Sequence, residues 1–131
     1  MAERIEVIDI SYAQQKVDFG KIKASGIDAV IIRTGYYNKT DTMFEAHMKG
    51  AIEAGLNIGV YTYMMSENTA QAALEATQTL ERLKKYKEHI TYPVFCDMES
   101  PKYYETPKFT KRIRTDMVIA FCNTIAQAGY Y

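Results

Sequence analysis

"EAGLNIGVY" at residues 53–61 has the same pattern as "ASGIDAVII" at residues 24–32 and "QAGYY" at residues 127–131. Each segment holds the end of a helix, a glycine that terminates it, an apolar residue and the first residues of a strand. The recurrence predicts helices and strands that alternate along the chain. Such alternation is typical of a parallel sheet whose strands are joined by right-handed crossovers.

Four strands are expected around these segments, at residues 5–10, 29–33, 58–63 and 94–97. Helices are expected after the N-cap residue Asp18, over residues 41–54, after an Asn68–Gln71 capping box, and from Thr106 and Pro107 to Gly129. The apolar stripe of the third helix is predicted to be Ala73, Ala76, Leu80 and Leu83, and that of the fourth Phe109, Ile113, Met117, Phe121 and Ile125.

Two architectures fit four βα units, an open doubly wound sheet and a (β/α) barrel. A nucleotide-binding open sheet carries a glycine-rich turn after its first strand, but the turn "DISYAQQ" at residues 9–15 has no glycine. The strands end instead in charged or aromatic residues, namely Asp9, Arg33, Tyr63 and Asp97. Functional residues of barrels lie at such strand ends, so the sequence favours an α/β fold of the TIM-like barrel type.

The length of the chain sets a limit on that barrel. The chain has 131 residues, whereas a closed eight-stranded barrel takes at least about 200. Residues 1–131 are therefore expected to form the N-terminal part of a single barrel domain, with a fifth strand beginning at Tyr130–Tyr131. A half-barrel exposes strand edges and core side chains. We expect a truncated or proteolysed piece, or a half that pairs with another chain in a homodimer or domain-swapped assembly.

Composition excludes several classes of protein. The 16 basic and 16 acidic residues balance, which argues against nucleic acid or an anionic membrane as partner. Apolar runs are too short to span a bilayer, and the charged residues 1–10 are unlike a secretory signal peptide. The two cysteines, Cys96 and Cys122, lack zinc-site spacing and are expected to pack as small buried thiols.

"PVFCDMES" at residues 93–100 is an apolar strand that runs into two acids, Asp97 and Glu99. Alternate residues of a strand share a face, so both carboxylates are expected to point the same way. Two carboxyls so close in an apolar setting cannot both ionise freely, and the pKa of one should rise. With Asp9 from the first strand, the set suits acid-assisted cleavage of a glycosidic bond. The alternative is that they cap the next loop or pair with Arg33.

Aromatic residues at the same strand ends are candidates for sugar binding. Tyr61 and Tyr63 share a strand face, and Tyr36 follows the second strand. Their flat, hydroxyl-tipped rings suit sugars, although core packing also explains them. Arg33 either holds an inward acid ionised or anchors a loop, and Asp41 is expected to cap a helix. The two histidines lack metal-ligand spacing, so no metal site is expected.

Three motifs in order, D-I-S at residues 9–11, A-G-L-x-x-G-V-Y-x-Y at residues 54–63 and D-x-E at residues 97–99, together resemble the glycoside hydrolase family 25 lysozymes, or Chalaropsis-type muramidases. The resemblance covers nearly the whole chain. It implies an irregular (β/α) barrel that cleaves the β-1,4 bond between N-acetylmuramic acid and N-acetylglucosamine in bacterial peptidoglycan, without a metal or other cofactor.

The same resemblance implies roles for the acids. Glu99 would be the general acid, Asp97 would orient and polarise the substrate's N-acetyl group as an internal nucleophile, and Asp9 would lie near the floor of the groove. A further active-site aspartate is implied on a late strand, beyond Tyr131. The substrate implies an extracellular or cell-wall location, or release from a phage-infected cell. The competing hypothesis is an inactive half-barrel that binds glycan or assembles through its exposed edges.

Overall fold

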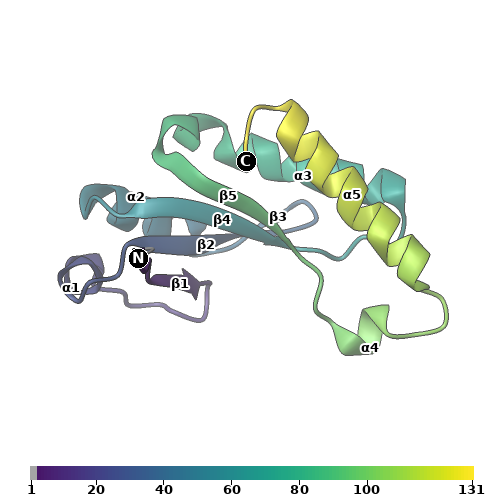
Figure 1. The fold of residues 1–131 in the computed structure, drawn as a ribbon, viewed down its shortest axis with the longest axis horizontal. Helices are drawn as coiled ribbons and strands as arrows, with labels where there is room; N and C mark the ends of the chain where they lie inside the picture. Colours follow the sequence, from purple (N-terminus) through teal and green to yellow (C-terminus); the bar gives the residue numbers. More distant parts are fainter. Residues whose placement is uncertain (1–2) are drawn as a thin grey trace.

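The computed structural model describes residues 3–131 and contains a five-stranded sheet. Four strands are parallel, in the order β1 (Val7–Ile10), β2 (Ala29–Tyr36), β4 (Asn57–Tyr63) and β5 (Ile90–Asp97); β3 (Lys39–Thr40) pairs antiparallel with β2. Order in space follows order in the chain (Figure 1). Within the described residues the sheet is open, with β1 and β5 at its edges. The expected α/β fold, a barrel begun but not closed, is confirmed.

The helices are α1 (Phe19–Ala24), α2 (Phe44–Glu53), α3 (Thr69–Leu83), the 3₁₀ helix η1 (Lys84–His89), α4 (Pro101–Tyr104) and α5 (Lys111–Gln127). Helices α1, α2 and α3 with η1 lie between consecutive parallel strands in the chain, and α4 and α5 follow β5. Helices α3 and α5 lie side by side next to β5 (Figure 1). The core lies between helices and sheet, and its fully buried side chains include Val30, Ile32, Val60, Phe44, Met48, Ala76, Met117 and Phe121.

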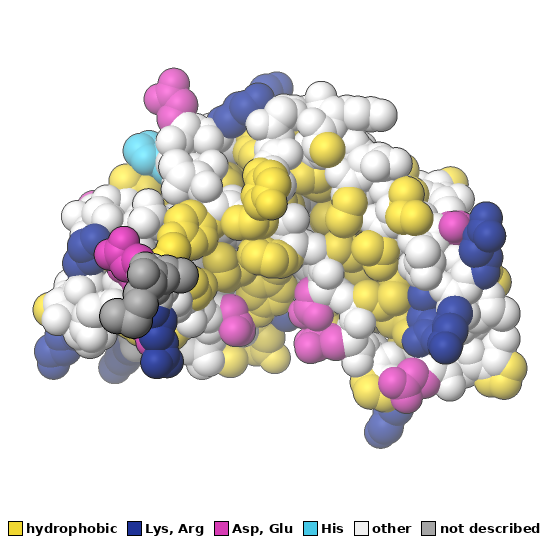
Figure 2. All heavy atoms as spheres, viewed as in Figure 1, with side chains coloured by type: hydrophobic (Ala, Val, Ile, Leu, Met, Phe, Trp, Pro, Cys, Tyr) yellow, Lys and Arg dark blue, Asp and Glu magenta, His cyan; other side chains and the backbone are white. Residues whose placement is uncertain are grey.

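The opposite face of the sheet carries no helix among the described residues. Alternate strand residues point to this side, where Val7 and Phe95 are 43% and 46% exposed. Figure 2 shows hydrophobic side chains gathered over the middle of the molecule, with acidic side chains along the lower margin of this group. A closed barrel turns this face inward. The sequence prediction that core side chains would be exposed is therefore confirmed at these positions.

Strand boundaries differ from the predicted ones. β1 begins at Val7 instead of residue 5, and β5 begins at Ile90 instead of residue 94, because Ile90 already pairs with Ile58 of β4. β2 continues past residue 33 to Tyr36 through a register irregularity next to β4. At the outer edge of β5, the Val94 N–H donates to the Tyr131 carbonyl at 2.8 Å. The backbone where a fifth strand is predicted to begin thus lies beside β5.

The last crossover departs most from the prediction. Thr106 does not cap a helix; α5 begins at Lys111, and the Thr110 hydroxyl accepts from the Ile113 N–H at 3.2 Å. Phe109 is buried ahead of the helix, where its ring centroid lies 5.2 Å from that of Tyr104. Ile113 is 38% exposed, so its assignment to the buried face was wrong. The packing of Phe109 on the rings of α4 delays the start of α5.

Half of the predicted apolar stripe of α3 is confirmed, because Ala76 and Leu83 are fully buried. Ala73 and Leu80 are only half-buried, and the residue one position before each, Ala72 and Thr79, is fully buried instead. Glu75 lies on the same face as these buried residues and is also fully buried. Within residues 3–131, none of the helices has the length and hydrophobicity that crossing a membrane requires.

Candidate active site

The strand ends bring three carboxylates to one pocket. Asp9 from β1 and Asp97 and Glu99 from the end of β5 line a pocket of about 440 Å³ on the helix-free face of the sheet. Its other lining residues are Ile31, Tyr61, Phe95 and Cys96. We call this the carboxylate pocket. Parallel strands end at the same edge of a sheet, which is why acids far apart in the sequence meet here.

Burial raises the pKa of the Asp97 carboxyl from 3.8 to about 6. The charge of Glu99, a hydrogen bond with its side chain and the charge of Asp9 act in the same direction, while Arg33 opposes them. The spacing of the two acids predicts that the pKa of one carboxyl rises, and it is Asp97 that has the raised value.

The Tyr61 side chain lies at the centre of these charges. Burial raises the pKa of its hydroxyl, and Arg33 acts against that rise. Asp9 and Asp97 raise the pKa further, whereas a hydrogen bond with Ser11 lowers it. The hydroxyl is therefore neutral at physiological pH and can serve as a hydrogen-bond donor among the carboxylates.

Replacement of Asp97 by asparagine is expected to stabilise the protein at neutral pH. The folded state raises the pKa from 3.8 to about 6, so the wild type loses stability as the pH rises through that interval and Asp97 ionises. The side-chain amide of the variant does not ionise, so Asp97→Asn should gain stability relative to the wild type between about pH 4 and pH 6. Urea unfolding midpoints of both proteins across this range measure the effect.

Glu53→Gln, at an exposed position of α2, is the control for loss of a surface carboxylate, and its unfolding midpoints are measured at the same pH values. A stability difference between Asp97→Asn and the wild type that is the same at about pH 4 and about pH 7 would contradict the assignment of the raised pKa to Asp97.

A second pocket, of about 690 Å³, adjoins the first along β2 and β4. We call it the tyrosine pocket, because Tyr12, Tyr36 and Tyr63 line it together with Arg33, Lys39, Thr40, Asp41, Thr42 and Met65. The sequence-predicted sugar-binding residues are thus divided between two pockets. Tyr61 lies with the carboxylates, and Tyr63, Tyr36 and Arg33 lie in the tyrosine pocket. Their roles stay predictions.

Arg33 anchors the loop that follows β1. Its Nε lies 2.6 Å from Asp41 Oδ2, and its guanidinium lies 4.7 Å from the centre of the Tyr12 ring. Asp41 Oδ2 also accepts from the Tyr12 N–H at 3.0 Å, and its Oδ1 accepts from the Met43 N–H at 2.8 Å. The contacts fit both alternatives for Arg33, because its ion-pair partner Asp41 is a fully buried acid and Tyr12 belongs to the loop after β1. Sequence reasoning missed Tyr12, which carries no signal beyond its place in a turn.

Tyr103 and Tyr104, which follow the acids on α4, hold the loop after β4. The Tyr104 hydroxyl lies 3.0 Å from the Met64 carbonyl and 2.9 Å from the Ser66 carbonyl, and the Tyr103 hydroxyl donates to the Met65 carbonyl at 3.2 Å. These contacts connect α4, which follows Glu99, to the loop after β4.

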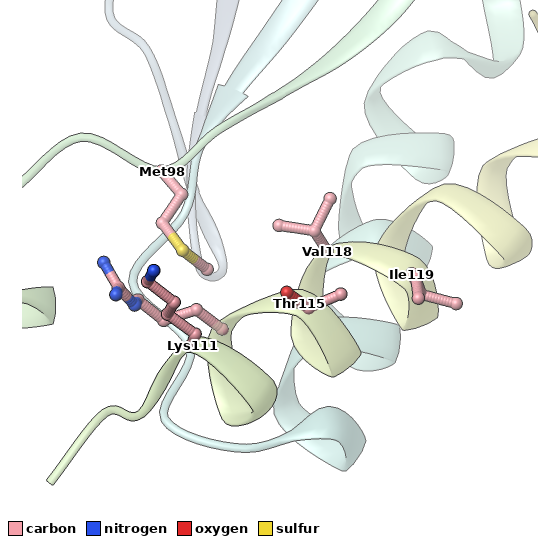
Figure 3. Close-up of a pocket in the computed structure, with 6 residues that line it drawn as sticks. Met98, Lys111, Thr115, Val118 and Ile119 are labelled. Carbon is pink, nitrogen blue, oxygen red and sulfur yellow. The ribbon is translucent and has the colours of Figure 1, made fainter.

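A third pocket, of about 370 Å³, lies between α5 and the loop after β5. Met98 reaches from that loop toward Lys111 (Figure 3), and Arg114, Thr115, Val118 and Ile119 complete the lining. Met98 thus faces a different pocket from its neighbours Asp97 and Glu99. Among the described residues, no carboxylate lines this pocket, so it does not extend the candidate site.

The two cysteines are free thiols in different settings. Cys96 is half-buried, and its Sγ lies 4.0 Å from Met64 Sδ. Burial raises the pKa of the Cys96 thiol to about 12. Cys122 is exposed on α5, so the prediction of two buried thiols was wrong for Cys122. The face of α5 that carries it is turned away from the packed side of the helix.

An open parallel sheet with helices on one face and carboxylates at its strand ends defines the first part of a β/α barrel. The chain belongs to a particular family of such barrels, the glycosyl hydrolases family 25, whose sequence model matches residues 8–131. The motifs of residues 9–11, 54–63 and 97–99 resemble the same family.

Individual relatives agree with this assignment. The autolytic lysozyme of Clostridium acetobutylicum is 35% identical over 77 residues, which are 58% of this chain and 24% of that protein. The modular autolysin LytC of Streptococcus pneumoniae, solved with a synthetic peptidoglycan ligand, is 31% identical with a TM-score of 0.81, covering 95% of this chain and 30% of that one.

The catalytic domain of endolysin ply40 from Listeria bacteriophage P40 shares the fold, with a TM-score of 0.79 and 23% identity over 99% of this chain and 62% of that one. The chain therefore spans about a quarter to a third of the length of the first two relatives, 24% and 30%.

Proposed function

We propose that the chain carries the first part of the active site of a peptidoglycan hydrolase, a muramidase that acts outside the cell or in the cell wall. The observation that supports it most is the convergence of Asp9, Asp97 and Glu99 with Tyr61 in one pocket at the strand ends. Membership in glycosyl hydrolases family 25 supports the reaction class. The peptidoglycan ligand of the similar pneumococcal autolysin supports the substrate.

In the proposed reaction, Glu99 donates a proton to the oxygen that leaves with N-acetylglucosamine, while the bond from that oxygen to C1 of N-acetylmuramic acid breaks. The carbonyl oxygen of the muramic N-acetyl group bonds to C1 as the internal nucleophile, and ionised Asp97 accepts the N–H of that group. Water then attacks C1 and passes a proton to Glu99, which restores the acid. The bond from C1 to the acetyl oxygen breaks in the same step, so the N-acetyl group is re-formed. Substrate-assisted schemes of this kind are known among glycoside hydrolases.

The aromatic residues are proposed to position the glycan. The Tyr61 hydroxyl, neutral among the acids, donates to the sugar bound at the cleavage point. The rings of Tyr36 and Tyr63 line the adjoining pocket, which has the size for a further sugar, and Arg33 keeps Tyr12 in its wall. Flat amphipathic rings suit the apolar faces of sugars.

Incubation of the protein with purified peptidoglycan, followed by borohydride reduction of new reducing ends, tests the proposal. Muramitol is the expected product, because cleavage at C1 of N-acetylmuramic acid leaves a muramic reducing end. Glucosaminitol in its place would contradict the bond assignment. Absence of any new reducing end from folded protein would favour the inactive half-barrel.

That second candidate is a half-barrel that binds glycan or assembles with another copy, and the exposure of the helix-free face favours it. Val7 and Phe95 are 43% and 46% exposed there. Pairing of two such faces in a homodimer would cover them. Sedimentation velocity over a range of protein concentrations detects the dimer, and a monomer at all concentrations rules it out.

A further inference from the structure

Glu75 is a buried carboxylate whose side-chain hydrogen bonds run to two loops at the carboxyl ends of the strands. It lies on α3 and has no exposed surface. Its Oε1 accepts from the Tyr37 N–H at 2.9 Å, and its two oxygens lie 3.3 and 3.2 Å from the Met65 N. The Ser66 hydroxyl donates to Oε2. Tyr37 belongs to the loop after β2, and Met65 and Ser66 belong to the loop after β4.

Packing does not explain a charged residue at this position. The neighbouring buried residues of α3, Ala72 and Ala76, are small and apolar. A buried carboxylate is costly unless hydrogen bonds replace the water that it loses. Here the loops provide those donors, which means that the carboxylate and the loops hold each other in place.

Arg82, two turns along the same helix, completes the contacts of the first loop. Its guanidinium donates to the Tyr37 carbonyl, and its Nη1 lies 3.5 Å from Thr34 Oγ1. Burial lowers the pKa of this half-buried arginine, and the charge of Glu75 acts against that lowering. The N–H and the carbonyl of Tyr37 are thus both held from α3.

Tyr37 has an unusual backbone conformation that needs such support. Its φ is 45°, the one positive value among the described residues other than glycine. Left-handed backbone is unfavourable for a tyrosine and persists only where its surroundings enforce it. The Tyr37 hydroxyl also donates to the Met65 carbonyl, so the loops after β2 and β4 are joined directly.

The immediate neighbours of these held groups form the tyrosine pocket. Tyr36 precedes Tyr37, and both Met65 and Tyr63 lie in or beside the second loop; all three line the pocket. We propose that Glu75 and Arg82 are positioning residues for glycan binding, which fix Tyr36 against Tyr63 and Met65 and so set the shape of the tyrosine pocket. This inference rests on the proposed function.

Titration of ¹⁵N-labelled protein with the N-acetylglucosamine tetramer tests it, with backbone amide shifts read separately in the two pockets. In the wild type, shifts are expected near Tyr36 and Tyr63 and near Asp97 and Glu99. Glu75→Gln keeps the size of the side chain but cannot accept all the loop donors. It should weaken binding on the order of tenfold and lose the shifts at Tyr36 and Tyr63, while those at Asp97 and Glu99 persist.

Glu81→Gln is the matched control, since Glu81 is exposed on the same helix; it should bind like the wild type. Arg82→Gln removes the contact with the Tyr37 carbonyl at a half-buried position and should also lose the amide shifts at Tyr36 and Tyr63. If Glu75→Gln does not fold, Arg82→Gln is the variant that tests the positioning role.

Three other outcomes are decisive. A wild type that binds no tetramer contradicts the proposed function and this inference with it. A wild type that binds, with Glu75→Gln or Arg82→Gln binding equally well, overturns the positioning role alone. Equal loss of shifts in both pockets would assign Glu75 to the stability of the whole fold and would also overturn it.

Discussion

Glu99→Gln is expected to lower the rate at which muramic reducing ends are released by about 10²- to 10⁴-fold, the usual contribution of a general acid. Glutamine has nearly the same shape as glutamate but cannot donate a carboxyl proton to the leaving oxygen. Initial rates of reducing-end release from purified peptidoglycan, at a fixed pH and with matched protein concentrations, measure the loss.

Two further variants serve as the control and as the test of which acid donates the proton. Glu105→Gln, at an exposed position just after α4, should keep the wild-type rate. Asp97→Asn separates the roles of the paired acids, because its raised pKa alone would make Asp97 the acid. If Asp97→Asn lost the proton-donating step while Glu99→Gln remained active, the assignment derived from the family would be wrong.

Gly35→Ala is expected to destabilise the protein by about 3–5 kcal/mol, from backbone strain and overpacking together. Gly35 has a φ of +148°, and a Cβ there would lie 2.0 Å from the Lys39 carbonyl oxygen and 3.0 Å from the Asp41 N. Both neighbours are backbone atoms, one in β3 and the other in the residue that follows it, so neither can move without disrupting the pairing of Gly35 with Thr40. Urea unfolding measures the change.

Gly26→Ala separates the two causes. Gly26 also has a positive φ, +92°, but nothing lies within 4 Å of a Cβ built on it. The free energy of unfolding of this variant should fall only by the cost of a left-handed backbone at alanine, about 1–2 kcal/mol. Equal losses in the two variants would show that the turn at Gly35 can relax around a methyl group.

Much of the fold could be predicted from the sequence because its signals are local. The glycines at residues 26, 55 and 129 all have positive φ and follow helices, as the repeated pattern of helix end, glycine and strand start predicts. The strand runs 29–33 and 58–63 lie within β2 and β4. The last crossover was not predictable in the same way, because Thr106 and Pro107 carry a helix-start signal but α5 begins at Lys111. Burial of Phe109 against α4, a tertiary contact, selects Thr110.

In the candidate site, too, some features follow from local sequence signals and others depend on tertiary contacts. Alternation along β5 and the shared edge of parallel strands are enough to place Asp97, Glu99 and Asp9 together. The tyrosine pocket depends on the contact of Arg33 with Asp41 and on the loop that carries Tyr12, neither of which has a sequence period. Glu75 had one available signal, a charged residue three positions after Ala72 on the buried face of a helix. It was missed because the predicted apolar stripe was one residue off at that point of α3.

The strand order β1-β2-β4-β5 has a consequence for how the protein is made. Each parallel strand pairs with the one synthesised before it, so the sheet can grow in one direction while the chain leaves the ribosome. Asp9 is synthesised first and stays exposed to water until β5 docks. Only then do Asp97 and Glu99 join it to form the carboxylate pocket. Among the described residues β5 is itself an edge strand, so its docking moves the unpaired edge outward and does not remove it. The strand that completes this cluster of acids is therefore also the one whose outer edge is left open to pairing.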